Sequence, residues 1–438
     1  MSINRTPDRM PDPEGARRQV HALREPPSDL QTLRRVTGRH PAPRDPSADS
    51  PILHIAALPL HGDRVLGIVN GELLVRDDHA KRAAEILAPL GYRAAPSRAL
   101  DGKLGVVRFT SANVPRLVAI DAQVLRARGM DANANVVHAA AMRGKSALPP
   151  VWTDTPLPTD VDPSVGTGAH IVVIDTGLAA DVGGRGDTWL GGIPLDPANT
   201  DLLTDINDAQ GDRDQNQVPY LDDAAGHGTF VTGVVRQCAP GATVTMMRAL
   251  DSDGLGSEDQ LAAAIVAAGE LSPHVIVIAA AEESPDDSPP VALAGALACL
   301  DPEILVVAAA GNSPDTRPSW PAAFRRVVAV AGLRQDGEPA DDWSKRGPWV
   351  TCSAVAEDVL STFVHGTENP DLMNGRAPGV WDAGEGAPVA IWAGTSFAAP
   401  RVAGLIAARV GTGTTPRQAL ADLLASGTPR PGFGVALT

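Results

Sequence analysis

The sequence is poor in the residue types that mark several classes of protein. It holds three cysteines in 438 residues, and Cys238, Cys299 and Cys352 are too widely spaced to predict a disulfide framework or a zinc site. Aromatic residues make up only 3% of the chain, so the core must be built from Val, Leu, Ile and Ala. Basic residues are in the minority, and the net charge of −15 argues against nucleic acid or an anionic membrane surface as a partner.

Long hydrophobic runs are missing as well. No run approaches the length of a membrane span, and the opening residues Met1 to Arg5 are not followed by the apolar stretch of a signal peptide. We therefore expect a cytoplasmic protein without a membrane partner, although this pattern does not exclude non-classical export.

The N-terminal third of the chain divides into two unlike segments. Residues 1–51 are rich in Pro, Arg, Asp and Ser and have no sustained periodicity, which predicts disorder. Residues 52–143 alternate between strand and helix patterns in the order βαββαβ, which predicts a small α+β, ferredoxin-like module. Its strands are expected at 71–76, 92–99, 104–110 and 135–141, and its helices at 79–90 and 114–128.

The rest of the chain reads as a larger α/β domain. Residues 144–168 contain repeated prolines and have the composition of a linker. From 169 to 438, short apolar strands alternate with helices, which predicts a doubly wound, mainly parallel sheet. The expected strands are 169–174, 242–249, 274–280, 303–310 and 327–331, and the expected helices include 257–270, with Ser257 as its N-cap, 291–300 and 416–425.

Two reactive side chains stand at the ends of predicted elements. Asp175 directly follows a buried strand, a common way to present a carboxylate at the edge of an α/β sheet, although a turn residue is an equal alternative. His227 lies between Gly226 and Gly228 at the start of a predicted helix. A lone histidine is more often structural, yet these glycines leave its ring approachable and serve no obvious packing purpose.

A third reactive group lies in Gly394-Thr395-Ser396-Phe397-Ala398-Ala399-Pro400, which opens an Ala-rich helix predicted from Phe397 to Ala408. A helix N-terminus favours developing negative charge, as a nucleophile requires. Pro400 is expected in the first turn, where a missing N–H costs little. The alternative is that Thr395 or Ser396 is only an N-cap.

An acidic stretch between residues 196 and 223 offers a candidate calcium loop. Asp212, Asp214 and Asn216 place oxygen atoms at alternate positions, as calcium loops do, but no bidentate Glu follows at the expected position. A solvated acidic loop is therefore favoured over a calcium site.

The chain order Asp175, His227, Ser396 is the order of the Asp-His-Ser triad in subtilisin. The segments 173–177, 226–233 and 394–404 match, nearly residue for residue, the three signature blocks of the subtilisin-like serine proteases, and Ala309-Ala310-Gly311-Asn312 matches a fourth. The chain thus resembles the subtilases over about residues 165–425.

The resemblance implies a role for each matched residue. Ser396 would attack a peptide carbonyl, His227 would take and return the proton, and Asp175 would hold the imidazole. Asn312 and the Ser396 N–H would bind the oxyanion. The resemblance therefore implies a serine endopeptidase with peptide or protein substrates, for which no cofactor is required.

The family also clamps its substrate as an added strand between two backbone segments. By position the clamp residues are Gly254, Leu255 and Gly256 on one side and Ala279, Ala280 and Ala281 on the other, with Ala310 and Gly311 near the oxyanion site. Ala281-Glu282 replaces glycines common in relatives. Glu282 and Glu283 suggest the hypothesis of a basic residue at P1, the position before the cut bond.

Many subtilases carry a βαββαβ prodomain that assists folding and occupies the cleft. By this resemblance, residues 52–143 would be the chain's own prodomain and intramolecular inhibitor, which a slow-forming parallel sheet would benefit from. Self-processing is expected between about residues 141 and 152, with His138 to Met142 in the cleft. The alternatives are a catalytically silent binding module with this fold and a protease that is permanently gated until a partner releases it.

Overall fold

The computed structural model describes residues 55–60, 65–95, 104–141, 150–153, 155–158, 160–184, 189–204, 218–370, 377–381, 388–410 and 413–437. The segment 1–51 and the candidate calcium ligands Asp212, Asp214 and Asn216 lie outside these residues. The predictions made for them are therefore not tested by the structure.

An eight-stranded sheet forms the centre of the C-terminal part of the chain. Every neighbouring pair in it is parallel except β19 with β20 at one edge. The alternation of strands and helices predicts such a mainly parallel sheet. In spatial order the strands are β19 (Thr428–Arg430), β20 (Gly434–Leu437), β14 (Cys352–Val355), β13 (Val327–Leu333), β12 (Leu305–Ala309), β10 (Val275–Ile278), β7 (His170–Asp175) and β8 (Thr243–Arg248).

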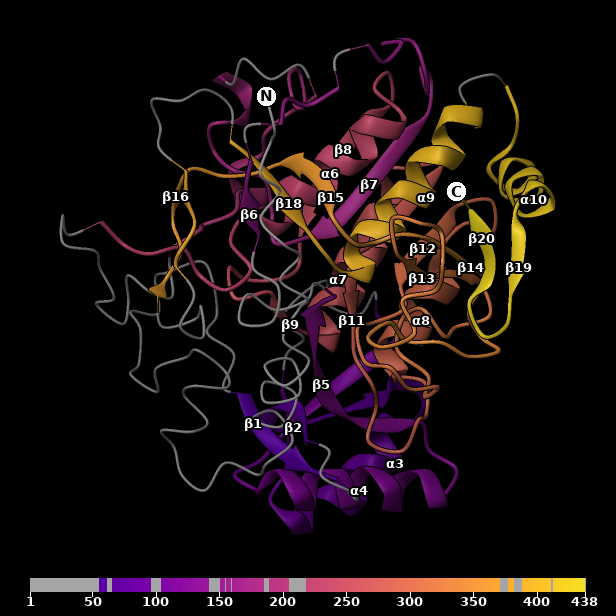
Figure 1. Ribbon diagram of the computed structural model, residues 1–438. Helices are drawn as coiled ribbons and strands as arrows, with labels where there is room; N and C mark the ends of the chain where they lie inside the picture. The colour runs from indigo at the N-terminus through magenta and orange to yellow at the C-terminus, as the bar shows by residue number, and fades with distance from the viewer. Residues whose placement is uncertain are drawn as a thin grey trace.

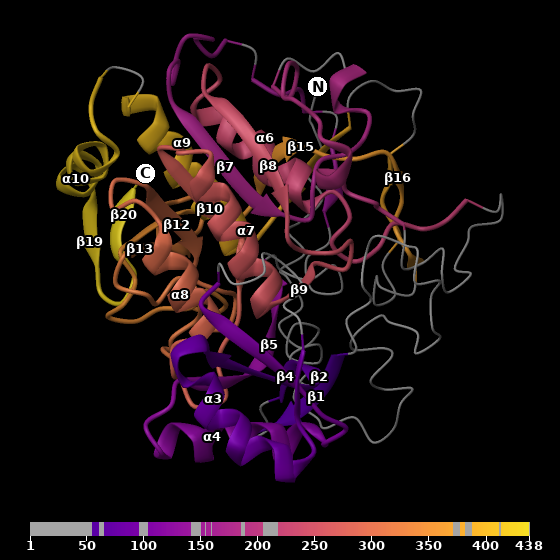
Figure 2. The same cartoon turned by 180° about the vertical axis from the view of Figure 1, so that it is seen from behind.

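Helices cover both faces of this sheet (Figures 1 and 2). Because alternate residues of a strand face opposite sides, Ile171 and Val173 of β7 pack in the core with α6 (His227–Cys238) and α9 (Thr395–Val410). Val172 and Ile174 face the other side, where they pack with α7 (Glu258–Glu270) and α8 (Val291–Cys299). Helix α10 (Pro416–Ser426) packs against α9.

The described residues between 55 and 141, called the N-terminal module below, form an antiparallel sheet with two helices on its outer face (Figure 1). The other face lies against α7 and α8 of the C-terminal part, where Leu74 and Leu104 join the core of those helices. The elements are β1 (Ile55–Pro59), β2 (Val65–Arg76), α3 (Asp77–Leu87), η1 (Ala88–Leu90), β3 (Arg93–Ala95), β4 (Val106–Thr110), α4 (Pro115–Ala127) and β5 (Ala132–Ala140).

Short strands complete the structure around the main sheet. Within the segment predicted as a linker, β6 (Val151–Trp152) pairs with β18 (Val389–Trp392), so these two residues are part of a sheet. Strands β9 (Leu255–Ser257) and β11 (Ala280–Ala281) both pair with β5 of the N-terminal module. The remaining elements are β15 (Val359–Thr362), β16 (Gly366–Thr367), β17 (Val380–Trp381), η2 (Val182–Gly184) and η3 (Pro197–Asn199).

Of two predictions about helix starts, the structure confirms one and contradicts the other. The cap predicted for α7 is confirmed, since the Ser257 N–H donates to Gln260 Oε1 at 3.0 Å. The placement of Pro400 in the first turn is wrong, because α9 already begins at Thr395 and Pro400 lies inside the helix. A proline there removes the bond that an N–H would donate to the Ser396 carbonyl.

None of the helices in the described part of the chain is both long enough and apolar enough to cross a membrane.

Candidate active site

Asp175 and His227 meet at the carboxyl end of β7. Asp175 is the last residue of that strand and His227 the first of α6, and His227 Nδ1 lies 2.7 Å from Asp175 Oδ1. Both side chains are fully buried. The imidazole also packs against the rings of Trp392 and Phe397, at centroid distances of 5.8 and 5.5 Å. The carboxylate and the two aromatic rings together fix the orientation of the histidine ring.

The glycines beside His227 have a packing role, contrary to the expectation from sequence. Gly226 adopts φ +82°, and a Cβ on it would lie 2.8 Å from Val364 Cγ2. A Cβ on Gly228 would lie 2.3 Å from the Gly177 carbonyl oxygen. Gly228 therefore lets the start of α6 contact the turn that follows Asp175, which brings His227 within reach of the carboxylate, and Gly226 leaves room for Val364.

Asp201, which the sequence did not single out, ties the two turns together. Its Oδ2 accepts from the Gly226 N–H at 2.9 Å and from the Thr176 hydroxyl at 3.0 Å, and Oδ1 accepts from the Leu203 N–H at 3.1 Å. Thr176 Oγ1 in turn accepts from the Gly228 N–H at 3.0 Å. Burial raises the pKa of Asp201 to about 6, although the hydrogen bonds from Gly226, Leu203 and Thr176 oppose the shift. No spacing pattern in the sequence indicates this role.

Ser396 lies in the first turn of α9 and is fully buried. Its Oγ donates to the Ala279 carbonyl at 3.0 Å. Among the residues that the structure describes, His227 Nε2 has no hydrogen-bond partner. The structure thus joins Asp175 to His227 but does not join His227 to Ser396. A serine hydroxyl turns about a single bond, and here the Ala279 carbonyl competes for its proton.

Asn312 follows β12 and is held by the residue before the serine. Its Oδ1 accepts from the Thr395 N–H at 3.0 Å and from the Thr395 hydroxyl at 2.9 Å. An N–H can donate only to the amide oxygen, so these contacts fix which way the Asn312 amide faces and leave its NH₂ group for another acceptor. Thr395 Oγ1 also accepts from the Gly311 N–H at 3.0 Å, and the Ala310 N–H donates to Val330. Ala310 and Gly311 therefore hold the Asn312 loop in position.

The end of β5 lies between the two predicted clamp segments as a third strand. Val137, His138 and Ala139 pair antiparallel with Ser257, Gly256 and Leu255, while Ala139 and Ala140 pair with Ala281 and Ala280. The Ala140 N–H donates to the Gly254 carbonyl at 2.8 Å. All six predicted clamp residues thus border residues 137–141 of the module, which are called the tail below. Ala281, which replaces a glycine common in relatives, does not prevent this pairing.

Ala141 brings the end of this tail to Ser396. The Ala141 N–H donates to the Ala279 carbonyl at 2.8 Å, and its carbonyl oxygen accepts from the Ser396 N–H at 2.9 Å. Ala141 is 5% exposed. Met142, the last residue of the expected tail, lies outside the described residues. The last described residue of the tail therefore places its carbonyl on the backbone donor expected to bind an oxyanion.

His138 is fully buried in the tail. Neither of its ring nitrogens makes a hydrogen bond of good geometry within the described structure. Burial lowers the pKa of His138 to about 4, with a small opposing effect from the Trp320 backbone. The tail therefore docks with this imidazole neutral.

Buried polar side chains join the module to the starts of α7 and α8. Asn133 donates to Glu258 Oε2 at 2.5 Å and accepts from the Val291 N–H at 2.8 Å, while Glu258 Oε1 accepts from the Ala292 N–H at 2.7 Å. Burial raises the pKa of Glu258 to about 8, against the lowering effect of Asn133 and the α8 backbone.

Next to it, Asn135 donates to Asp259 Oδ1 at 3.0 Å and to Glu72 Oε2 at 2.9 Å, and Arg108 pairs with Glu72 at 2.7 Å. The neighbouring Asp259 carboxylate adds to the effect of burial on the pKa of Glu258, which favours keeping Glu258 protonated.

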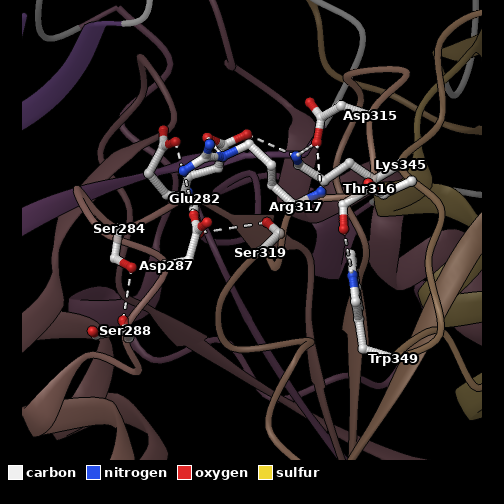
Figure 3. Close-up of polar contacts among 11 residues, drawn as sticks. Glu282, Ser284, Asp287, Ser288, Asp315, Thr316, Arg317, Ser319, Lys345 and Trp349 are labelled. Carbon is white, nitrogen blue, oxygen red and sulfur yellow. Dashed lines mark hydrogen bonds and ion pairs between the residues drawn. The ribbon is translucent and has the colours of Figure 1, made fainter. Parts of the chain in front are cut away.

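A second charged cluster joins the segment that follows β11 to the segment that follows Asn312 (Figure 3). The Lys345 ammonium lies 2.7 Å from Glu283 Oε1 and 2.6 Å from Asp315 Oδ1. Arg317 Nε approaches Glu283 Oε2 at 3.3 Å, and Arg317 also pairs with Asp287. Burial would raise the pKa of Asp315, but the Lys345 ammonium outweighs this and lowers it. Lys345, missed at the level of sequence, is 3% exposed.

Metal ligands do not gather in the described part of the chain: no group of three or more His, Cys, Asp or Glu side chains there could hold an ion. The three cysteines are free thiols.

Comparison with known proteins agrees with this geometry. The profile of the Subtilase family matches residues 166–414. A protein of Paenibacillus polymyxa described as an intracellular serine protease is 26% identical over 278 residues, which are 59% of this chain and 69% of that protein.

Among solved structures, fervidolysin from Fervidobacterium pennivorans, a keratinolytic enzyme related to subtilisin, aligns with a TM-score of 0.55 at 17% identity. The alignment covers 84% of this chain and 60% of fervidolysin, so it supports a common fold. A lanthipeptide protease aligns with a TM-score of 0.45 at 21% identity, over 61% of this chain and 85% of that one.

The family match covers more than half of the chain and includes Asp175, His227, Asn312 and Ser396, so the chain belongs to the subtilase family of serine proteases.

Proposed function

We propose that this protein is a serine endopeptidase made as a zymogen, and that it cuts its own chain after Ala141. The observation that carries the proposal is the position of the module's tail, whose last carbonyl accepts the Ser396 N–H at 2.9 Å while the tail pairs with both sides of the cleft. A substrate bound in the same way would present its carbonyl carbon to Ser396 Oγ.

The proposed reaction begins when the Ser396 hydroxyl turns from the Ala279 carbonyl toward His227 Nε2. As Oγ attacks the carbonyl carbon, its proton passes to Nε2, and Asp175 stabilises the imidazolium through the 2.7 Å contact with Nδ1. The negative charge on the carbonyl oxygen is met by the Ser396 N–H and by the NH₂ group of Asn312.

The tetrahedral intermediate then collapses. The C–N bond breaks, the leaving amine takes the proton from His227, and the acyl group remains on Ser396 as an ester. Water repeats the sequence with His227 as base and releases the carboxylate product. No step uses a cofactor, and the solvated acidic loop favoured over a calcium site at residues 212–216 stays a prediction.

We further propose that residues 52–143 act as a prodomain and as the enzyme's own inhibitor. After cleavage, Ala141 would carry a carboxylate in the cleft and block access to Ser396 until the module leaves. A module that never leaves would give the gated alternative. The name of the Paenibacillus polymyxa relative, an intracellular serine protease, supports our expectation that this chain also acts inside the cell.

The test is to incubate purified full-length protein and to follow its mass and its reaction with a fluorophosphonate probe. We expect a fragment that begins at Met142 and a probe signal that Ser396→Ala abolishes. Labelling that rises when residues 1–143 are removed supports gating. An intact chain beginning at Met1 in active enzyme overturns self-processing, and equal labelling of wild type and Ser396→Ala overturns the catalytic proposal.

A further inference from the structure

We propose that Lys345 determines which residue is accepted at P1, and that it restricts P1 to small, uncharged side chains such as that of Ala141. The inference rests on the proposed endopeptidase function and deepens it, because it names the class of bond that is cut.

The space concerned lies beside the oxyanion residue. Ala141 is held at both ends, by Ala279 at its N–H and by the Ser396 N–H at its carbonyl. Gly311 immediately precedes Asn312, and a Cβ on Gly311 would lie 3.2 Å from Lys345 Cδ and 3.4 Å from Ser319 Oγ. The aliphatic part of Lys345 therefore already occupies the space beside Gly311.

The ammonium end of Lys345 is fixed by two carboxylates from different segments of the chain. Glu283 follows β11, the strand that pairs with the tail, and Asp315 follows the Asn312 loop. Lys345 Nζ contacts both carboxylates, at 2.7 and 2.6 Å (Figure 3). The Lys345 N–H also donates to the Gly311 carbonyl at 3.0 Å, which fixes the base of the side chain. Lys345 thus bridges the segment that follows β11, the strand paired with the tail, and the segment that follows the oxyanion residue Asn312.

This bridge limits the size of the side chain that can be accepted at P1. The side chain of Lys345 is 4% exposed, so it cannot swing into water without opening the structure around it. A large P1 side chain would have to push the lysine aside and separate it from two carboxylates, leaving buried charges without their partner. A methyl group makes no such demand.

The same cluster disfavours a charged side chain at P1. The Glu283 carboxylate is shared between Lys345 and Arg317, and Glu282 Oε1 accepts the Glu283 N–H at 2.8 Å. A basic P1 residue would have to compete with these contacts, which argues against the basic preference suggested by the sequence. The carboxylate of an acidic P1 residue would be repelled by Glu283 and Asp315, which already share the Lys345 ammonium.

The test compares peptides that differ only at P1. Substrates whose P4 to P2 residues are those of the tail, His-Ala-Ala, would carry Ala, Ser, Leu, Phe, Lys or Glu at P1, and kcat/KM would be measured with processed wild-type enzyme. We expect Ala and Ser to exceed Phe, Lys and Glu by at least about 10-fold, since pocket contacts of one methylene already discriminate by roughly 10- to 200-fold.

Variants identify Lys345 as the cause. Lys345→Ala should lower the ratio of Ala to Phe by about 10-fold and raise cleavage after Lys, because space and two carboxylates become available. The double variant Lys345→Ala, Glu283→Gln guards against misfolding by removing one unpaired charge, and it should keep the gain for Phe but not that for Lys. Arg430→Ala, which breaks an ion pair with Glu338 on the edge strand β19, is the matched control and should leave the ratios unchanged.

The outcomes separate this inference from the proposed function. Wild-type cleavage that depends on Ser396 but prefers Phe, Leu or Lys at P1 overturns the role of Lys345 and leaves the endopeptidase intact. Unchanged ratios in both folded Lys345 variants do the same. If no peptide is cut in a Ser396-dependent way, both proposals fail together.

Discussion

The carbonyl oxygen of Ala141 accepts a hydrogen bond from the backbone N–H of Ser396 at 2.9 Å. These residues are far apart in the sequence and belong to different parts of the fold, yet they meet where the reaction is proposed to occur. The contact places the end of the N-terminal module where we propose that a substrate binds, and the predictions below concern the groups around it.

Asn312 is predicted to stabilise the oxyanion. Asn312→Ala removes one donor and should lower kcat by about 100- to 1000-fold with little change in KM, because the lost bond forms mainly in the transition state. Steady-state kinetics on a short peptide measures this. Thr395→Ser keeps the hydroxyl that holds Asn312 Oδ1 at 2.9 Å and should retain near wild-type activity. An Asn312→Ala enzyme with unchanged kcat would remove this residue from the mechanism.

Asp201 is predicted to position the catalytic pair without touching substrate. Asp201→Ala leaves the Gly226 N–H and the Thr176 hydroxyl without their acceptor, and each such buried group costs about 1–3 kcal/mol. We expect a lower melting temperature together with a lower kcat in Asp201→Ala. Asp201→Asn keeps one acceptor oxygen, so its values should lie between those of wild type and of Asp201→Ala. Thermal unfolding and kinetics at one pH check both effects. Wild-type values of Tm and kcat in Asp201→Ala would contradict the positioning role.

Because the pKa of Glu258 is raised, we expect the full chain to lose stability as the pH rises. Its pKa is about 8 in the folded chain, above the ordinary value of 4.5, so the folded state keeps a proton that the unfolded chain releases. The stabilising effect is complete below pH 4.5 and is lost as the pH approaches and passes 8.

The measurement is the Tm of the Ser396→Ala full chain, which cannot process itself, at several pH values. Glu258→Gln should flatten the decline between pH 6.5 and 8. Glu270→Gln, at the exposed end of the same helix, should not. An equal slope in Glu258→Gln and in its parent would refute the assignment to Glu258.

His138 predicts the opposite dependence at lower pH. Its pKa of about 4 lies below the ordinary 6.5, so the docked ring stays neutral where the free ring is protonated. Its contribution to docking is complete above pH 6.5 and is lost as the pH falls toward 4, which partly cancels the effect of Glu258 between pH 4.5 and 6.5.

The same Ser396→Ala chain can be used for this test. His138→Leu should remove the loss of stability between pH 6.5 and 4, whereas His79→Leu, on α3 outside the cleft, should keep it. If acid lowers the Tm of the His138→Leu chain as much as that of its parent, the protonation of His138 is not the cause.

The positions of most elements followed from the sequence, because they depend on local patterns. The continuous apolar run 169–174 and the Ser257 cap gave β7 and α7 within about one residue. The prediction that the glycines beside His227 have no packing role is wrong. Gly228 lies close to Gly177, and no local pattern reveals this contact between distant segments.

The sequence by itself determined the family, the order Asp175, His227, Ser396, and the residue that accompanies them at position 312, because these are short motifs whose residue types are fixed by chemistry. Only the tertiary structure decided that the Ala141 carbonyl meets the Ser396 N–H, that Asp201 joins the turns beside Asp175 and His227, and that Glu283 is already paired with Lys345. Each of these depends on packing between residues distant in the chain, where burial and the geometry of a few hydrogen bonds decide which groups meet.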